Sequence, residues 1–96
     1  MPIFKGSTID WYMASGIVRN HPCEVRIDVS SVVVSFRYEN INYVCSGHEI
    51  AKGHFELKDP DRKAKATLHM KPDDDVLEGW WLEGGYDCMW RITLDE

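Results

Sequence analysis

The chain has 96 residues, 44% of them hydrophobic and 28% charged, with a formal net charge of −5. This composition is typical of one folded domain over residues 1–96 and excludes a disordered polypeptide. The acidic balance disfavours nucleic-acid binding, because such binding depends on lysine and arginine at the phosphates and no basic stripe interrupts this chain.

Alternating apolar and polar residues predict β-strands along most of the chain, because every second side chain of a strand lies on the same face of a sheet. In chain order, the predicted strands cover residues 8–18, 24–29, 32–38, 41–46, 54–58, 64–70, 77–82 and 88–94. Turns are predicted between strands at Ser30-Ser31, Glu39-Asn40 and Asp59-Pro60-Asp61. The regular register of residues 64–95 makes an antiparallel β-meander the expected arrangement.

Two short motifs are expected to modify this pattern. Gly16 marks a bend or a bulge in the first strand. The segment Ser46-Gly47-His48-Glu49 has the Ser-x-x-Glu spacing of a capping box, which predicts a single helical turn ended by Gly53. Such a turn is too short to be stable by itself.

Eight short strands in meander order are expected to close into a barrel, because closure removes the unpaired edges of a sheet. The predicted fold class is therefore all-β, an antiparallel up-and-down meander of about eight strands closing into a small barrel. A two-sheet sandwich and a five-stranded OB or SH3-like roll would show the same alternation and remain alternatives. The expected common core comprises Val25, Ile27, Val34, Phe36, Phe55, Leu57, Leu68, Trp81, Trp90 and Ile92.

The last two predicted strands carry a family resemblance. The pattern Leu77-x-Gly79-x-Trp81, followed by Gly85 and by Trp90-Arg91-Ile92-x-Leu94, resembles the closing hairpin of small lipocalin-like and avidin-like barrels and of some bacterial sensor domains. The Gly-x-Trp motif of the first lipocalin strand is absent, since four residues separate Gly6 from Trp11. The resemblance implies a barrel whose open end receives a small, partly apolar ligand, but it assigns no ligand-contacting residue.

The sequence contains no specific motif for metal binding, nucleophilic catalysis or phosphate binding. Cys45-x2-His48-x5-His54, with His21-x-Cys23 elsewhere, offers zinc-compatible donors without the paired spacing of a zinc site, so we expect no metal and no cofactor. The chain has neither a Gly-x-Ser-x-Gly elbow nor a glycine-rich phosphate loop. We therefore expect a non-enzymatic protein without catalytic residues.

The cysteines and the lengths of the apolar runs predict the cellular compartment of the protein. Cys23, Cys45 and Cys88 are odd in number and widely spaced, which argues against a disulfide framework and favours a reducing compartment. No apolar run reaches the roughly 20 residues of a membrane span, and the N-terminal residues lack the apolar region of a secretory signal. We expect a cytoplasmic protein that binds neither membranes nor nucleic acids.

Two adjacent tryptophans lead to two hypotheses of binding. Trp80 and Trp81 follow each other in one predicted strand and must point to opposite faces, with Trp81 expected inside the barrel. In the first hypothesis a small molecule is bound by inward-facing side chains, namely Phe36, Tyr38, Tyr43, Trp81 and Trp90. This hypothesis requires internal space, because ligand pockets usually measure about 300–1,000 Å³.

The second hypothesis concerns the outside of the barrel. An exposed apolar patch that contains tryptophan and tyrosine is typical of a protein interface. The patch expected here comprises Tyr12, Trp80, Leu82 and Met89, and it would bind a protein partner or a second copy in a homodimer. Alternatively, residues 1–7 of the same chain fold over this face and cover it.

Overall fold

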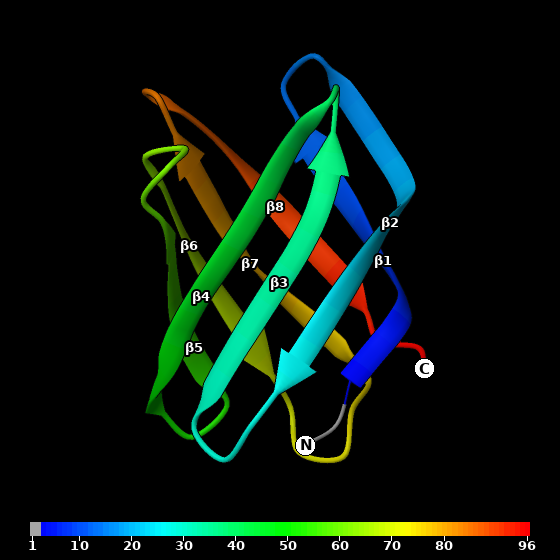
Figure 1. The fold of residues 1–96 in the computed structure, drawn as a ribbon, viewed down its shortest axis with the longest axis vertical. Helices are drawn as coiled ribbons and strands as arrows, with labels where there is room; N and C mark the ends of the chain where they lie inside the picture. Colours follow the sequence, from blue (N-terminus) through cyan, green and yellow to red (C-terminus); the bar gives the residue numbers. More distant parts are fainter. Residues whose placement is uncertain (1–2) are drawn as a thin grey trace.

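Eight antiparallel strands form a closed barrel in the computed structural model, which describes residues 3–96 and the side chains of all of these except Tyr86. The strands are β1 (Ile3–Met13), β2 (Gly16–Ile27), β3 (Ser31–Tyr38), β4 (Ile41–Ala51), β5 (His54–Asp59), β6 (Ala64–Met70), β7 (Val76–Glu83) and β8 (Tyr86–Thr93). Each strand pairs with the next, and β1 also pairs with β8, which closes the sheet (Figure 1). The predicted all-β meander and its closure are confirmed, and the sandwich and the five-stranded roll are excluded.

The barrel interior follows from the two-residue period of the strands. One row of side chains from each strand points inward, and large apolar residues of these rows fill the part of the barrel nearer the chain termini. The fully buried apolar residues are Ile9, Val25, Val32, Val34, Cys45, Leu57, Leu68, Leu77, Trp90 and Ile92. Nine of the ten predicted core residues are buried, and Ile27 is partly buried against this cluster.

The two ends of the barrel differ in how they are closed. At the end that holds the termini, the buried Ser7 hydroxyl donates to the carbonyl of Phe4 and accepts from the backbone N–H of Asp95, at 3.0 and 3.1 Å. The backbone N–H of Gly6 also donates to the carbonyl of Asp95, at 2.9 Å. The hairpin turns that follow β1, β3, β5 and β7 surround the opposite end (Figure 1). We call this second end the open end, and aromatic residues gather beneath it.

The predicted first strand over residues 8–18 is wrong at its end. The chain turns at Ala14 and Ser15, so Gly16 begins β2 instead of bending a continuous strand. A bulge does occur, but later, where Arg19 and Asn20 lie opposite the single residue Asp10. Asn20 has a positive φ of 57°, and its backbone N–H donates to the Asp10 carboxylate at 2.8 Å, which stabilises the bulge.

The predicted helical turn at Ser46 is also wrong, because residues 46–51 continue β4. Gly47 faces inward opposite Leu57, where a Cβ atom would lie 1.6 Å from the backbone oxygen of Glu56. The glycine therefore permits a close approach of β4 and β5, and pairing with both neighbouring strands replaces the capping bonds of a helix. Glu49 instead accepts a hydrogen bond from the backbone N–H of Gly53 at 2.9 Å, across the β4–β5 turn.

The predicted second strand, residues 24–29, begins eight residues after the start of β2 and ends two residues beyond its end. β2 ends at Ile27, and Val29 lies in the β2–β3 connection with 95% of its surface exposed.

Within residues 3–96 no helix is long and apolar enough to cross a membrane.

Candidate ligand site at the open end

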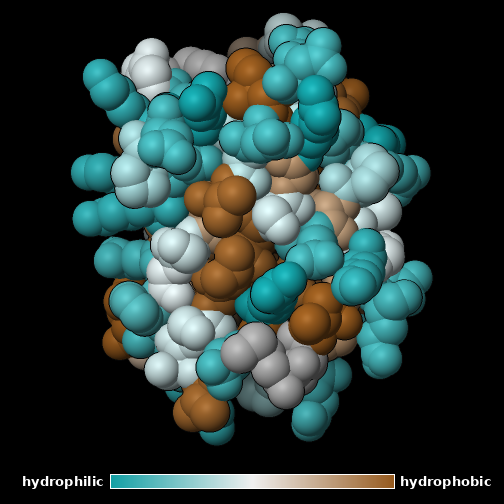
Figure 2. All heavy atoms as spheres, viewed as in Figure 1, coloured by the Kyte–Doolittle hydropathy of each residue, from teal (hydrophilic) through white to brown (hydrophobic). Residues whose placement is uncertain are grey.

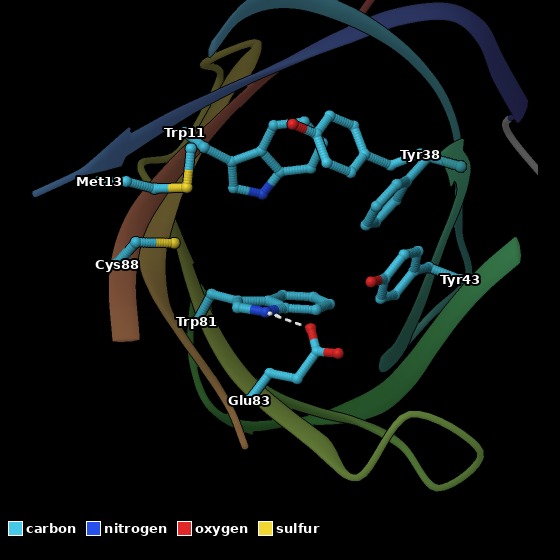
Figure 3. Close-up of a pocket in the computed structure, with 8 residues that line it drawn as sticks. Trp11, Met13, Tyr38, Tyr43, Trp81, Glu83 and Cys88 are labelled. Carbon is cyan, nitrogen blue, oxygen red and sulfur yellow. Dashed lines mark hydrogen bonds between the residues drawn. The ribbon is translucent and has the colours of Figure 1, made fainter. Parts of the chain in front are cut away.

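A small cavity lies inside the barrel beneath its open end. Its volume is about 40 Å³. Figure 3 shows aromatic rings on most sides of this space, with Trp11 and Trp81 facing it from opposite walls and two sulfur-containing side chains beside them. The lining residues are Trp11, Met13, Phe36, Tyr38, Tyr43, Trp81, Glu83 and Cys88.

The alternation of the strands places these side chains. Trp11 and Met13 occupy consecutive inward positions at the end of β1, and Phe36 and Tyr38 do the same at the end of β3. Trp81 and Glu83 end β7 in the same way, so strands from several sides of the barrel meet at one level. Tyr43 and Cys88 lie near the starts of β4 and β8, so the site consists of inward residues on both sides of the turns at this end.

Ring contacts join the walls into one aromatic surface. Phe36 and Tyr43 stack with their centroids 4.8 Å apart and their planes 10° apart. Trp11 lies 5.3 Å from Phe36, and Tyr43 lies 5.8 Å from Trp81 in an edge-to-face arrangement. Aromatic pairs at such spacings add about 0.5–1.5 kcal/mol each beyond the burial of their area. The walls therefore support one another.

A second layer of residues lies beneath the cavity and supports Trp81. Trp90 packs edge-to-face against Trp81 with centroids 5.1 Å apart, and its indole N–H donates to the backbone carbonyl of Thr67 at 3.1 Å. Gly79 lies opposite Trp90 in the register, and a Cβ atom on it would stand 1.8 Å from the same carbonyl oxygen. The missing side chain at Gly79 thus lets β6 and β7 approach closely under the cavity.

Carboxylates are the charged groups of this end of the interior. The indole N–H of Trp81 donates to Glu83 Oε1 at 3.2 Å, which orients the carboxylate at the cavity (Figure 3). Asp59 is buried in the same cross-strand row, since it pairs with Ala64 and Ala64 pairs with Glu83. Its carboxylate accepts a hydrogen bond from the backbone N–H of Val44 at 2.9 Å.

The three cysteines are free and buried. Burial raises the pKa of Cys23 to about 12. Burial also raises the pKa of Cys45 to about 12, with further contributions from the carboxylates of Asp59 and Glu83. The pKa of Cys88 is raised by burial and then by Asp87 and Glu83. These thiols stay protonated at neutral pH, which is unlike a cysteine nucleophile.

The structure brings together four of the five side chains expected to hold a ligand. Phe36, Tyr38, Tyr43 and Trp81 line the cavity, whereas Trp90 lies below Trp81 and does not reach it. Trp11, Met13, Glu83 and Cys88 also line the cavity, although they were not among the expected ligand residues. Because Tyr12 is expected to point outward, the same alternation would have placed Trp11 and Met13 inside.

The expected outer patch lies in a single cross-strand row. Met89 pairs with Trp80 on one side and with Tyr12 on the other, and Leu82 follows two residues after Trp80 on the same face. Trp80 and Met89 are exposed over 46% and 47% of their surface, and Tyr12 is half-buried. Ile17, which pairs with Tyr12, extends the row and is also exposed.

The N-terminal segment does not cover this patch within the described residues. Residues 3–7 belong to β1, where Phe4 pairs with Val25 near the opposite end of the barrel. Met1 and Pro2 lie outside the described residues.

The face that carries β3 and β4 holds another apolar area, with hydrophobic side chains gathered in its centre and hydrophilic ones around them (Figure 2). Outward-facing Val33 and Val44 lie on these two strands.

The zinc-compatible residues are separated by the sheet. Cys45 is buried in the interior, whereas His48 and His54 are exposed on the outer face. His54 instead contacts His69 across β5 and β6, with the two Nδ1 atoms facing each other. Within residues 3–96, no three histidine, cysteine or acidic side chains come together as metal ligands would.

Comparison of the chain with models of known protein families, with curated proteins and with solved structures gave no significant match. The functional interpretation therefore rests on the residues and the geometry described above.

Proposed function

We propose that this protein is a non-enzymatic binding module that accepts one compact, partly apolar group of a small molecule at the open end of its barrel. The observation that carries the proposal is the aromatic cavity with a single oriented carboxylate at its edge. Ligand sites are mostly apolar and contain a few placed polar groups, which is the composition found here.

The cavity volume limits what such a ligand can be. At about 40 Å³ the enclosed space is far below the roughly 300–1,000 Å³ of pockets that enclose a drug-sized ligand. A group of a few atoms fits, and the remainder of the molecule stays at the rim among the turns. This narrows the lipocalin-like function implied by the sequence resemblance, in which the barrel surrounds most of its ligand.

Two further expectations belong to this proposal. The raised pKa values of the three thiols argue against cysteine catalysis and so support a binding role. We also propose a cytoplasmic location, because three free cysteines are typical of a reducing compartment.

The four tryptophans allow a direct test by NMR of their indole N–H groups. Two line the cavity (Trp11 and Trp81), one lies beneath Trp81 without reaching the cavity (Trp90) and one is on the outside (Trp80). Titration with a library of small amphipathic compounds should shift the Trp11 and Trp81 signals in a saturable way and leave Trp80 unchanged. A library in which no compound shifts the two cavity signals would refute the proposal.

A pair of tyrosine variants gives the matched control for that titration. Tyr38 is half-buried at the cavity, and Tyr12 is half-buried on the outer face of the barrel. Tyr38→Ala should weaken a ligand that binds in the cavity by about tenfold, the equivalent of a lost aromatic contact of about 1.4 kcal/mol. Tyr12→Ala should leave its affinity unchanged.

A second candidate function is self-association through the outer patch of Tyr12, Trp80, Leu82 and Met89. The exposure of Trp80 and Met89 in adjacent strands favours it, because contiguous exposed apolar area is typical of interfaces. Glu56, Lys58 and Lys65 lie in a groove beside Trp80, so charged side chains border the apolar centre that a two-fold interface would use twice.

A further inference from the structure

We infer that the cavity at the open end selects an organic cation, namely an alkylated ammonium group, over a neutral or anionic group of the same size. This inference rests on the proposed ligand-binding function and names its ligand class. Three properties of the cavity support it: its aromatic walls, the sign of its charges and its size.

The aromatic walls suit a cation without hydrogen-bond donors. The face of an aromatic ring is electron-rich and attracts a cation within about 6 Å of its centroid, most strongly when the ring is tryptophan. Trp11 and Trp81 flank the cavity from opposite sides, and the stacked pair of Phe36 and Tyr43 closes a third side (Figure 3). A single group in this space therefore contacts several rings at once.

The charges around the cavity are acidic. Glu83 lies at the cavity and has one carboxylate oxygen held by Trp81, while its second oxygen has no partner among the hydrogen bonds of the described side chains. Asp59 is buried in the same row of the sheet. None of the eight lining residues is lysine, arginine or histidine. A cation inside the cavity therefore meets only acidic or uncharged lining side chains, and the basic residues Arg62 and Lys63 of this end lie in the β5–β6 turn outside the lining.

Carboxylates at this end of the interior also act on two buried cysteines, Cys45 and Cys88, after the larger effect of burial. Every charged group that perturbs the pKa of Cys45 or Cys88 is a carboxylate, and each raises that pKa by opposing a second negative charge. The field that disfavours a thiolate at these positions favours a cation beside them. The net charge of −5 on the whole chain also attracts cations to the open end.

The size of the cavity and its few acceptors favour an alkylated over a primary ammonium. A space of about 40 Å³ cannot enclose a large ligand, so recognition concerns one compact group seated at the open end. A primary ammonium brings three donors, and burying donors without acceptors is unfavourable by about 1–3 kcal/mol each. Methyl groups in their place need no acceptor and keep the positive charge.

A matched pair of probes tests the inference. Choline and 3,3-dimethylbutan-1-ol have nearly the same shape, and they differ in whether nitrogen or carbon stands at the centre of the head group. Each is titrated into the intact chain while the indole N–H signals of Trp11 and Trp81 are followed by NMR. We expect choline to bind at least tenfold more tightly than the neutral alcohol, with saturable shifts of both cavity signals.

A second comparison assigns the preference to Glu83. Glu83→Gln keeps an oxygen for the Trp81 N–H and removes the charge, so it should reduce choline affinity at least fivefold and leave the alcohol unchanged. The control is Glu78→Gln, which removes a charge from an exposed position on the same strand and should alter neither probe. Circular dichroism verifies that each variant is folded, and if Glu83→Gln does not fold, the probe pair on the native chain decides alone.

Failure of this inference can be distinguished from failure of the proposed function. If the alcohol binds as tightly as choline, or if only neutral compounds of the wider library shift the cavity signals, the cation preference is wrong and the ligand site stands. If no compound of either kind shifts them, both are wrong.

Discussion

At the scale of single residues, Trp90 connects the stability of the barrel to its cavity. It is 1% exposed, donates a hydrogen bond to the carbonyl of Thr67 and supports Trp81 from below. Gly79 makes this arrangement possible, because it is the neighbour whose missing side chain leaves room for the Thr67 carbonyl. The spacing Leu77-x-Gly79-x-Trp81 therefore has a packing reason within this chain.

Removing the Trp90 side chain should have a large effect. We expect Trp90→Ala to lower the free energy of unfolding by about 3–5 kcal/mol, the usual range for a buried tryptophan, because a cavity opens and the Thr67 carbonyl loses its donor. Urea denaturation followed by circular dichroism measures this. Trp80→Ala, on the exposed side of the barrel, is the control and should change the value by less than about 1 kcal/mol. An unchanged melting temperature for Trp90→Ala would show that the inward register is wrong.

The cysteines give a second prediction at this scale, which concerns pH. With a pKa near 12, Cys23 and Cys45 hold only about one thiolate in ten thousand at pH 8, so a thiolate-specific reagent should react slowly with the native chain. All three thiols should react within minutes in denaturant. Because the folded chain holds these protons to higher pH than the unfolded chain does, the thiols lower the stability as pH rises from about 9 towards 12. Rapid labelling of native protein at pH 8 would contradict their burial.

At the scale of the strands, the sequence pattern predicts the second half of the barrel better than the first. Each of the three predicted strands within residues 64–94 alternates regularly between its turns, and β6, β7 and β8 follow that register. The first hairpin turns at Ala14-Ser15, directly before Gly16. Ser15-Gly16 is a turn signal, but a glycine inside an apolar run is equally consistent with a bulge, and the prediction interpreted Gly16 as a bend or bulge within one strand. The bulge at Asn20 is specified by a hydrogen bond to Asp10 on the neighbouring strand, and a local pattern does not reveal such a bond.

In the candidate site, too, the local sequence pattern predicts the inward side chains but not the contacts between strands. Strand alternation is enough to bring Phe36, Tyr38, Tyr43 and Trp81 inside, since each side chain follows the period of its own strand. Glu83 is different, because an acidic residue next to a Gly84-Gly85 turn looks like a solvated surface group. Its position at the cavity depends on the indole N–H of Trp81, which is a tertiary contact.

Gly47 allows the corrected β4 strand to be tested. If residues 46–51 formed a helical turn, Gly47→Ala would stabilise the chain by up to about 1 kcal/mol, because alanine favours helix. In the barrel a Cβ atom at this position overlaps the backbone of Glu56, so we expect the same substitution to lower the free energy of unfolding by about 3 kcal/mol. Urea denaturation distinguishes the two signs. Ser46→Ala, exposed on the neighbouring outward position, is the control and should be nearly neutral.

At the scale of the whole molecule, closure of the sheet leaves the outside of the barrel as the remaining unpaired surface. β1 pairs with both β2 and β8, so residues 3–96 leave no strand of the barrel as a free edge for addition of another strand. Any partner of the described residues must therefore bind through side chains, either at the open end or on an outer face. The row of Tyr12, Met89 and Trp80 is the outer feature that combines aromatic and apolar side chains in adjacent strands.

This row of side chains leads to a prediction of the oligomeric state. Exposed apolar surface is unfavourable in water by about 25 cal/mol per Å², and a two-fold interface that uses the patch twice removes it on both copies. We expect the native chain to sediment as a dimer at micromolar concentration. Trp80→Glu should give a folded monomer, because it places two like charges near the interface centre and leaves the barrel interior untouched. Val44→Glu on the opposite apolar face is the matched control and should remain dimeric. A native chain that sediments as a monomer at high micromolar concentration would rule out this interface, whereas the cavity at the open end needs no second copy and would keep its function.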